Sequence, residues 1–237
     1  MNIIVTGASR GIGYEIVRSM AGKPGMNILA IARNKKDLMD LKLSCTGLPS
    51  GNAVEVISAD LSESGNLKNE VIPLIYKQFD HLDILVNNAG YLVNKPFGQT
   101  DENELEMTFR INFTVPWLMI QSLTELLSKS GRSHVVNISS IGGIQGSIKF
   151  PGLSAYSSAK GAVGILTECL AAELADRNVS VNCLALGSVQ TEMFSKAFPG
   201  YKAQLKPDEI ASFITDFAIN GNRYFNGKII PVSVSTP

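Results

Sequence analysis

Short apolar runs recur along the chain, and segments of helical length separate them. Most of these runs are continuous rather than alternating, which is typical of strands that helices cover on both faces. We expect strands at residues 3–5, 28–32, 53–59, 82–87, 134–139, 179–185 and 228–232. We expect helices at residues 14–21, 35–43, 64–79, 102–127, 154–177 and 207–219. This order predicts an α/β fold with a doubly wound, seven-stranded parallel sheet.

The pattern continues through the chain without an internal repeat, a low-complexity tract or a polar linker. We therefore expect a single domain over residues 1–237. The least regular segments are residues 142–153 and 187–206, which are rich in Gly, Ser, Lys and Phe. In open α/β sheets ligands bind beyond the carboxyl ends of the strands, where both segments should emerge. We expect them to border a substrate.

Charge and cysteine content narrow the possible partners. Lys plus Arg equals Asp plus Glu at 21 each, so no net field favours nucleic acid or an anionic membrane. The three cysteines and two histidines are scattered, and we expect no metal site. No apolar segment approaches the roughly 20 residues of a membrane-spanning helix. The first strand begins too early to leave room for a signal peptide, so we expect a cytoplasmic protein.

Three glycines, Gly7, Gly11 and Gly13, lie between the first strand and the first helix. Glycine lets the backbone approach an anion closely, and a helix start offers unpaired N–H groups to a phosphate. The spacing G-x-x-x-G-x-G differs from the commoner G-x-G-x-x-G, and no Walker A lysine follows. The segment predicts a phosphate site, with a tight turn that binds nothing as the alternative.

Tyr156 and Lys160 are four residues apart near the start of a long helical segment, with Ser154 expected to cap the helix. A phenol has an ordinary pKa of about 10, and a nearby ammonium group should lower that pKa by stabilising the phenolate. The pair could therefore transfer a proton near neutral pH. The alternative is a surface contact without a function.

Two other tyrosine–lysine pairs have the same spacing but a different context. Tyr91 and Lys95 precede Pro96, which argues against a helix there. Residues 224–228 enclose an Asn-Gly turn dipeptide. Only the pair at 156 and 160 is expected to share a helical face.

Several motifs occur in a fixed order along nearly the whole chain: Thr6-Gly7-Ala8-Ser9-Arg10-Gly11-Ile12-Gly13, Asp60-Leu61, Asn87-Asn88-Ala89-Gly90, Asn112, Asn137-Ile138-Ser139-Ser140, Tyr156-Ser157-Ser158-Ala159-Lys160 and Gly187-Ser188-Val189-Gln190-Thr191. With these motifs the chain resembles the classical subgroup of the short-chain dehydrogenase/reductase family. The resemblance implies a single-domain Rossmann fold and an oxidoreductase that transfers a hydride between NADP(H) and a small carbonyl or alcohol. The alternative is a non-catalytic NADP-binding protein of the same fold that senses redox state.

The resemblance also implies catalytic roles. Tyr156 would exchange a proton with the substrate oxygen, while Lys160 would lower the tyrosine pKa and hold the nicotinamide ribose. Asn112 would position water in a proton relay. Ser139 and Ser140 compete to bind the substrate oxygen, because only one of two neighbouring strand residues can face the cleft. The family pattern Ser-x-x-Gly favours Ser140.

The cofactor residues implied by the resemblance are Gly7, Ser9, Arg10, Ile12, Gly13, Arg33, Asp60, Leu61, Asn88, Ala89, Gly90, Tyr156, Lys160, Val189 and Thr191. Asp60 and Leu61 would lie near adenine, and residues 88–90 near the adenosine ribose. Val189 and Thr191 would contact the nicotinamide carboxamide. Two alternatives stay open, since residues 88–90 could simply close the fourth strand and Thr191 could simply cap a helix.

The second expected strand ends in Ala32-Arg33-Asn34, without the carboxylate that usually binds the ribose hydroxyls of NAD. Arg33 and Arg10 can instead pair with the 2′-phosphate of NADP, because planar guanidinium groups suit phosphate. We therefore expect NADPH to be preferred. The alternative is that Arg33 is an ordinary solvated side chain.

Three features depart from the family pattern. Leu186 stands where a proline is usual, so the turn after it is expected to be looser. The segment from Ser140 to Tyr156 is longer than usual, with residues 148–151 as the extra material. The C-terminal residues 230–237 lack the acidic, glycine-rich ending of many relatives. The substrate stays open among 3-oxoacyl thioesters, sugar-like ketones, pteridines and other small carbonyls.

The helices expected at residues 102–127 and 154–177 are apolar over much of their circumference, with Ile165, Leu166, Leu170 and Leu174 on the second. One face of each should cover the sheet. The surplus apolar surface predicts burial against another subunit. We expect a homodimer or homotetramer.

Overall fold

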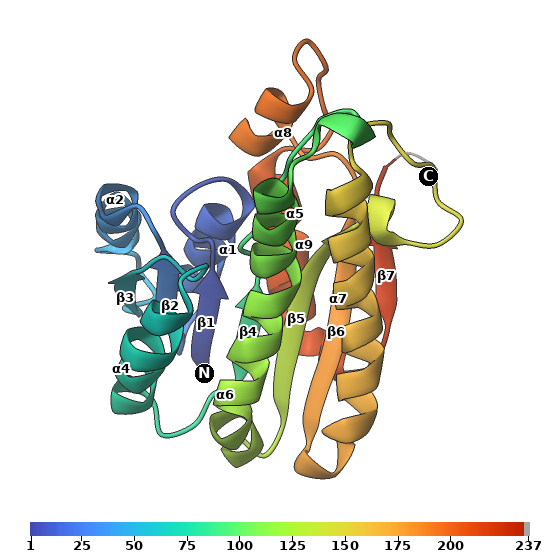
Figure 1. The fold of residues 1–237 in the computed structure, drawn as a ribbon. Coiled ribbons are helices and arrows are strands. Elements are labelled where there is room, and N and C mark those ends of the chain that lie inside the picture. Colours follow the sequence, from blue (N-terminus) through green and yellow to red (C-terminus); the bar gives the residue numbers. More distant parts are fainter. Residues whose placement is uncertain (235–237) are drawn as a thin grey trace.

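The computed structural model describes residues 1–234, except for the side chain of Ser64. Seven parallel strands form one sheet in the order β3-β2-β1-β4-β5-β6-β7, which confirms the expected fold (Figure 1). The strands are β1 (Asn2–Thr6), β2 (Asn27–Ala32), β3 (Ala53–Ser58), β4 (Ile84–Asn87), β5 (Ser133–Ser140), β6 (Val179–Leu186) and β7 (Ile229–Val232). The helices are α1 (Gly11–Ala21), α2 (Lys35–Cys45), α3 (Ser64–Asn66), α4 (Ile72–Gln78), α5 (Glu102–Phe109), α6 (Val115–Lys129), α7 (Ser154–Glu173), α8 (Glu192–Ala197) and α9 (Pro207–Asn220).

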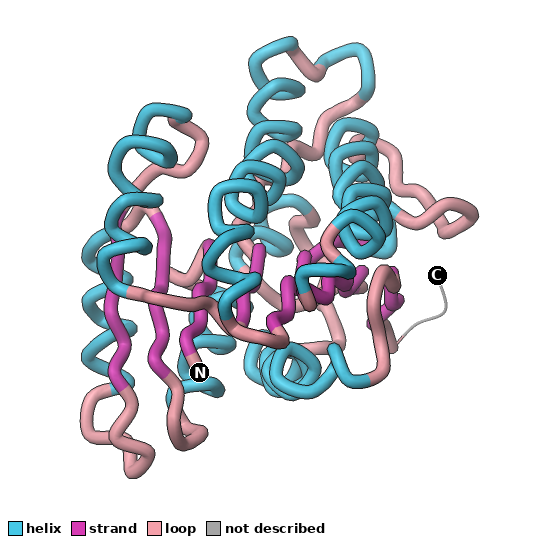
Figure 2. Tube along the Cα trace, turned by 90° about the horizontal axis from the view of Figure 1, so that it is seen from below, coloured by secondary structure: helices cyan, strands magenta, loops and turns pink. Residues whose placement is uncertain are grey.

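Helices cover both faces of the sheet (Figure 2). Alternating strand side chains fill one core on each face. In β1, Ile3 and Val5 pack with α1, α2 and α9, whereas Ile4 packs with α4 and α6 on the opposite face. All three of these side chains are fully buried. Burial on both faces explains why the strands read as continuous apolar runs in the sequence.

The strand order reverses direction next to β1, which pairs with β2 on one side and β4 on the other. At such a point the loops leave the sheet in opposite directions and open a crevice beyond the carboxyl ends of the strands. The turn after β1 and the loop after β4 border this crevice. The topology therefore places the glycine turn where a ligand is expected.

Two helices that the sequence predicts as continuous are interrupted by π-helical turns. The segment expected as a helix at 64–79 is helical over 64–78, but a π turn at Leu67–Val71 separates α3 from α4. The segment expected at 102–127 is helical over 102–129, and Arg110–Thr114 separates α5 from α6 in the same way. Each π turn lies just before a proline, Pro73 or Pro116, at the start of the following helix. Proline has no N–H to donate to the preceding turn, so the regular bonding cannot continue there.

Other differences from the sequence prediction are local. The irregular segment 187–206 contains the short helix α8. Ser154 is the first residue of α7 rather than its cap, because Leu153 occupies the cap position without a side-chain bond. Residues 235–237 of the unusual C-terminal ending lie outside the described residues. Within residues 1–234 the structure has no helix long and apolar enough to cross a membrane.

Candidate active site

The predicted site residues gather at one end of the sheet. Asn112 lies in the π turn between α5 and α6, and Tyr156 and Lys160 lie at the start of α7. The other predicted residues lie at the carboxyl ends of the strands: Gly7, Ser9, Arg10, Ile12 and Gly13 after β1, Arg33 after β2, Asp60 and Leu61 after β3, Asn88, Ala89 and Gly90 after β4, Ser140 at the end of β5, and Val189 and Thr191 after β6.

The glycine turn is too tight for side chains at two of its positions. Gly7 has a φ of +68°, and a Cβ placed there would lie 2.7 Å from the Cα atom of Ala89. A Cβ on Gly13 would lie 2.4 Å from the carbonyl oxygen of Gly7. Helix α1 then begins at Gly11, and no side chain caps its first N–H groups. Close backbone and uncapped N–H groups are the features that fit a phosphate.

Asn88 ties the loop after β4 to the glycine turn. Its Nδ2 donates to the carbonyl oxygens of Thr6 at 3.0 Å and Gly7 at 3.2 Å. The Thr6 hydroxyl in turn accepts from the backbone N–H groups of Asn88 and Ala89, both at 3.1 Å. These contacts support the alternative in which this segment closes the fourth strand. A contact with the adenosine ribose stays a prediction.

Asn112 is buried in the π turn and fixes the same loop from the other side. Its Nδ2 donates to the carbonyl oxygens of Tyr91 at 2.7 Å and Thr108 at 2.8 Å, and its Oδ1 accepts from the Tyr91 N–H at 3.3 Å. The same Oδ1 lies 3.4 Å from the position of a Cβ on Gly90. The asparagine thus shapes the crevice floor between the loop after β4 and the helix pair α5–α6.

The two serines at the end of β5 point in opposite directions. Ser139 is buried, and its hydroxyl donates to the backbone carbonyl of Lys160 at 2.7 Å. Ser140 is half-buried, and its hydroxyl accepts from the Gly142 N–H at 3.2 Å. In that bond Ser140 is the acceptor, so its own proton remains available to a substrate oxygen. The geometry favours Ser140 for this role, as the motif does.

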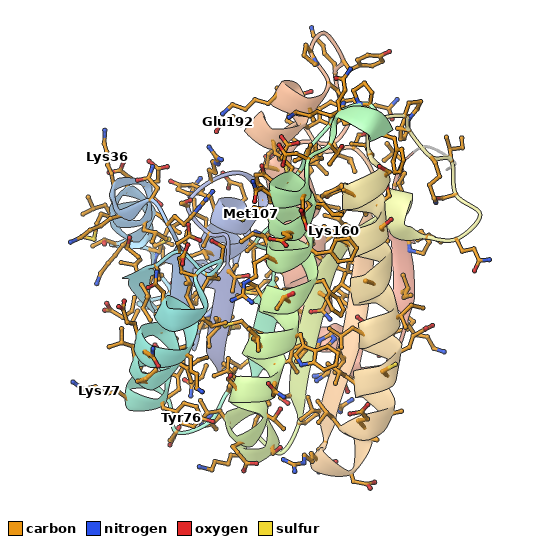
Figure 3. All side chains as sticks on the ribbon, in the orientation of Figure 1. Lys36, Tyr76, Lys77, Met107, Lys160 and Glu192 are labelled. Carbon is orange, nitrogen blue, oxygen red and sulfur yellow. The ribbon has the colours of Figure 1, made fainter. Side chains whose placement is uncertain are left out.

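Tyr156 and Lys160 share one side of α7, and Figure 3 shows Lys160 on the side that faces α5. The Lys160 side chain is buried, and its Nζ donates to the carbonyl oxygen of Ile138 at 2.8 Å. The same Nζ lies 5.7 Å from the centroid of the Tyr156 ring. This places the lysine charge against the tyrosine ring at the end of β5.

Burial raises the pKa of Tyr156 to about 12 and lowers the pKa of Lys160 to about 8. The expected lowering of the tyrosine pKa by the lysine is therefore not present. The reason is that the ammonium group points to the Ile138 carbonyl rather than to the phenol oxygen, so desolvation of the phenolate dominates. Tyr156 is therefore protonated at neutral pH.

The structure shows that the two other tyrosine–lysine pairs do not lie together on a helix. Tyr91 lies in the loop after β4, and Lys95 pairs with Glu104. Tyr224 is 79% exposed in the loop before β7. Neither pair shares a helical face.

Arg33 and Asp60 mark the end of the crevice beyond β2 and β3. The Arg33 guanidinium lies 3.6 Å from the Asp60 carboxylate, and the arginine side chain is 65% exposed. Burial alone would raise the pKa of Asp60, but hydrogen bonds from Ser62 and the charge of Arg33 outweigh it and lower the pKa. Leu61 is buried beside them.

The segment after β6 lies opposite the glycine turn. The Cγ2 atom of Thr191 is 3.5 Å from the position of a Cβ on Gly11. The Thr191 hydroxyl accepts from the Phe194 N–H at 3.1 Å and so caps α8, as the alternative expects. Val189 is buried and bridges to Leu205 through the backbone.

The turn that follows Leu186, where the family pattern has a proline, is held by a neighbouring strand. The N–H of Gly187 donates to the carbonyl oxygen of Val232 at 2.9 Å. A Cβ on Gly187 would lie 2.4 Å from the Oγ atom of Ser233, so the turn packs closely on the end of β7. These contacts restrain the turn where proline would otherwise do so.

Sequence reasoning missed Glu192, whose carboxylate lies 2.6 Å from the Arg10 guanidinium. It also missed Gly143, where a Cβ would lie 2.6 Å from the carbonyl carbon of Lys160. The Ser-x-x-Gly pattern contains Gly143 and could have pointed to it. No local signal pointed to Glu192, because the two ion-pair partners are 182 positions apart.

Comparisons with known proteins agree with this geometry. The family model described as short chain dehydrogenase matches residues 1–202. L-xylulose reductase of Caenorhabditis elegans is 34% identical over 192 residues, which cover 81% of this chain and 72% of that protein. A 3-oxoacyl-(acyl-carrier-protein) reductase of Chlamydia pneumoniae is 32% identical over 202 residues, covering 85% and 79%.

The fold is also that of a solved oxidoreductase. L-sorbose reductase of Gluconobacter frateurii, complexed with NADPH and L-sorbose, superimposes with a TM-score of 0.88 at 22% identity, covering 99% of this chain and 95% of that one. The match over residues 1–202, together with the relatives above 30% identity, decides the assignment. The chain belongs to the short-chain dehydrogenase family of oxidoreductases.

Proposed function

We propose that the protein is an NADP-dependent enzyme that interconverts a small carbonyl compound and its alcohol. The observation that carries this proposal is the buried lysine Lys160, held against the ring of Tyr156 at the end of β5. A non-catalytic protein would have no need of a buried charge beside a phenol. The three cysteines are free thiols, which suits a reducing compartment, so the proposed location is the cytoplasm.

The residues of the crevice fit a dinucleotide. The turn at Gly7 and Gly13 leaves no space for a Cβ, which brings the backbone N–H groups within reach of a pyrophosphate. Arg10 and Arg33 would hold the 2′-phosphate, while Asp60 would lie near adenine. When bound, the nicotinamide group supplies or accepts the hydride.

The side chains at the end of β5 and the start of α7 would handle the proton. Tyr156 donates its phenolic proton to the carbonyl oxygen during reduction and recovers it during oxidation. Ser140 donates to the same oxygen and orients it. To stabilise the phenolate that forms on Tyr156, the Lys160 ammonium would have to turn from the Ile138 carbonyl toward the phenol oxygen.

Asn112 uses both hydrogens of its side-chain amide on the carbonyl oxygens of Tyr91 and Thr108. A water molecule in a proton relay from Lys160 would therefore have to bind at these oxygens or at Oδ1 of Asn112. We propose that Asn112 serves the relay in this way, by fixing the Tyr91 backbone.

The test is Tyr156→Phe, which removes only the hydroxyl group. Turnover of carbonyl substrates, followed by the absorbance of NADPH, should fall by about 10²- to 10⁴-fold. NADPH binding and the unfolding temperature should stay near those of the unmodified enzyme. Tyr224→Phe is the matched control and should retain full activity. Substantial turnover in Tyr156→Phe would show that another group donates the proton.

We also propose that the enzyme is a homodimer or homotetramer. Trp117 on α6 is 44% exposed and Ile165 on α7 is 59% exposed, so both helices present apolar side chains to solvent. Leu166 and Leu174, which the sequence analysis named among the apolar residues of this second helix, are buried within the subunit. The proposed contact surface therefore depends on fewer side chains than the sequence indicated.

A further inference from the structure

We infer that the substrate is a ketone with an apolar alkyl or aryl body rather than a polyhydroxylated one; this inference rests on the proposed function. It comes from three segments that follow β4, β5 and β6: residues 91–99, 144–153 and 190–205. We call them together the outer wall. In Figure 1, α8 and the loop after β4 lie at the same end of the molecule as the start of α7.

Direct bonds join the three segments into one surface. The Asn94 side chain donates to the carbonyl oxygen of Ala197 at 2.6 Å. The Lys95 N–H donates to the carbonyl oxygen of Gly152 at 3.1 Å. Gly152 is four residues before Tyr156, so this part of the outer wall leads directly into the start of α7.

Several polar side chains of the outer wall already have partners. Lys95 pairs with Glu104 of α5. Gln190 donates to the Ser195 hydroxyl at 2.9 Å and accepts from the Ala203 N–H at 2.8 Å. In the insertion after β5, the Lys149 ammonium donates to the Ser147 hydroxyl at 2.6 Å. A polyhydroxylated substrate would have to break these bonds to use these side chains as partners for its own hydroxyl groups.

The apolar side chains of the outer wall remain open to a ligand. Phe194, Phe198 and Phe150 form a chain of rings, with centroids 5.2 Å apart for the first two and 6.2 Å apart for Phe198 and Phe150. Phe150 is still 50% exposed, and Met193 is 36% exposed. The Met193 methyl group lies 3.8 Å from the position of a Cβ on Gly90, on the crevice floor.

These side chains form an apolar surface that begins beside Gly90, at Met193, and includes the three phenylalanine rings. Exposed aromatic groups gathered beside a site mark a surface that binds apolar groups. Phe150 lies within residues 148–151, the segment expected to be additional to the family pattern. An alkyl chain or aromatic ring attached to the carbonyl carbon would cover these side chains.

The experiment measures kcat/KM for 2-butanone, 2-hexanone, 2-octanone and L-sorbose with NADPH in excess. We expect kcat/KM to rise by about two- to fourfold per methylene, because removal of one methylene from water is worth a factor of about four. L-sorbose should be reduced at least about tenfold less efficiently than 2-octanone.

Two variants test whether the outer wall causes this dependence. Phe150→Ser and Met193→Gln change exposed side chains, and each should lower the ratio of kcat/KM for 2-octanone to that for 2-butanone, which flattens the rise with chain length. Tyr224→Ser is the matched control, since it removes an exposed ring far from the outer wall, and it should keep the rise. A flat chain-length series, or a preference for L-sorbose, would overturn the inference alone. Failure to reduce any of the four compounds would count against the proposed function and the inference together.

Discussion

The Arg10 guanidinium lies 2.6 Å from the Glu192 carboxylate, so an ion pair joins the glycine turn to the first residue of α8. Figure 3 shows Glu192 on this helix, at the end of the molecule that carries the proposed site. A hydrogen bond from Lys196 and the charge of Arg10 lower the pKa of Glu192, which is therefore ionised at neutral pH. Both cations proposed for the 2′-phosphate therefore have an anionic partner, Glu192 for Arg10 and Asp60 for Arg33.

The first prediction follows from this competition. Glu192→Gln should lower KM for NADPH by roughly two- to fivefold, because an exposed ion pair is worth up to about 1 kcal/mol. KM for NADH should change less, since NADH has no 2′-phosphate. Glu125→Gln is the control, because Glu125 forms a similar exposed ion pair with Arg177 at 3.0 Å. An unchanged or increased KM for NADPH in Glu192→Gln would show that Arg10 does not bind the 2′-phosphate.

The second prediction concerns the choice of cofactor. Ala32→Asp combined with Arg33→Ser introduces a carboxylate at the end of β2 and removes a guanidinium. The ratio of kcat/KM for NADPH to that for NADH should fall by at least about tenfold, since the carboxylate can bind ribose hydroxyls and repels phosphate. Arg177→Ser, which removes an arginine elsewhere on the surface, should leave the ratio unchanged. A preference for NADH in the unmodified protein would contradict the proposed use of NADPH.

The sequence predicted the sheet and the proton-transfer pair for physical reasons. Strands buried on both faces give continuous apolar runs, as in β1, and the i, i+4 spacing of Tyr156 and Lys160 decides their shared face. The pKa of Tyr156 could not be predicted in this way. It depends on where the Lys160 ammonium points, and the carbonyl oxygen of Ile138 determines that direction through the packing of β5 against α7.

Features that join distant segments were also beyond sequence reasoning. The ion pair of Arg10 and Glu192 has no local pattern, and neither has the use of the Asn88 amide to hold Thr6 and Gly7. In the sequence only Pro116, four residues after Asn112, indicates the π turn. In each case the partner is chosen by the tertiary structure.

The third prediction tests how η4, the 3₁₀ turn Ile141–Gly143, positions α7. Gly143→Ala would place a Cβ 2.6 Å from the backbone of Lys160, so α7 or the turn must move. We expect kcat to fall by at least about tenfold and the free energy of unfolding to decrease by about 1–3 kcal/mol. Gly98→Ala is the matched control, because nothing lies within 4 Å of a Cβ at Gly98. Equal behaviour of the two variants would mean that the turn does not position the lysine.

The fourth prediction concerns subunit association. Light scattering at micromolar concentration should give the mass of at least two chains. Trp117→Ser together with Ile165→Ser should shift the mass toward one chain, since both side chains are exposed within the subunit and belong to the proposed contact surface. Phe213→Ser on α9, which removes a side chain of 43% exposure, should leave the mass unchanged. If light scattering gives the mass of one chain for the unmodified protein, the proposed interface is ruled out. The proposed chemistry would not be affected.

The last prediction is a loss of stability in mild acid that depends on His134. This histidine is fully buried on β5, where it contacts the Ala218 carbonyl oxygen through Nδ1 at 2.9 Å and the Asn182 amide through Nε2 at 3.0 Å. A neutral ring with its hydrogen on Nδ1 satisfies both partners, whereas a second proton on Nε2 would face the hydrogens of the Asn182 amide. Burial accordingly lowers the pKa of His134 to about 4.

The unfolded chain binds this proton more readily, because a free histidine has a pKa of about 6.5. The contribution of neutral His134 to stability is therefore fully present above about pH 6.5 and is lost as the pH falls toward about 4, by up to about 3 kcal/mol.

Urea unfolding at pH 7, 6 and 5 should show this decrease in the free energy of unfolding, and His134→Gln should remove most of the pH dependence. The exposed His81 provides the control, since His81→Gln should retain the decrease. The carboxyl groups Asp60 and Glu192, whose pKa values are lowered, lose their contributions only in more acidic solution, so they do not account for a change between pH 7 and 5. An unfolding free energy that is constant over this range would show that His134 is protonated in the folded protein as readily as in the unfolded chain.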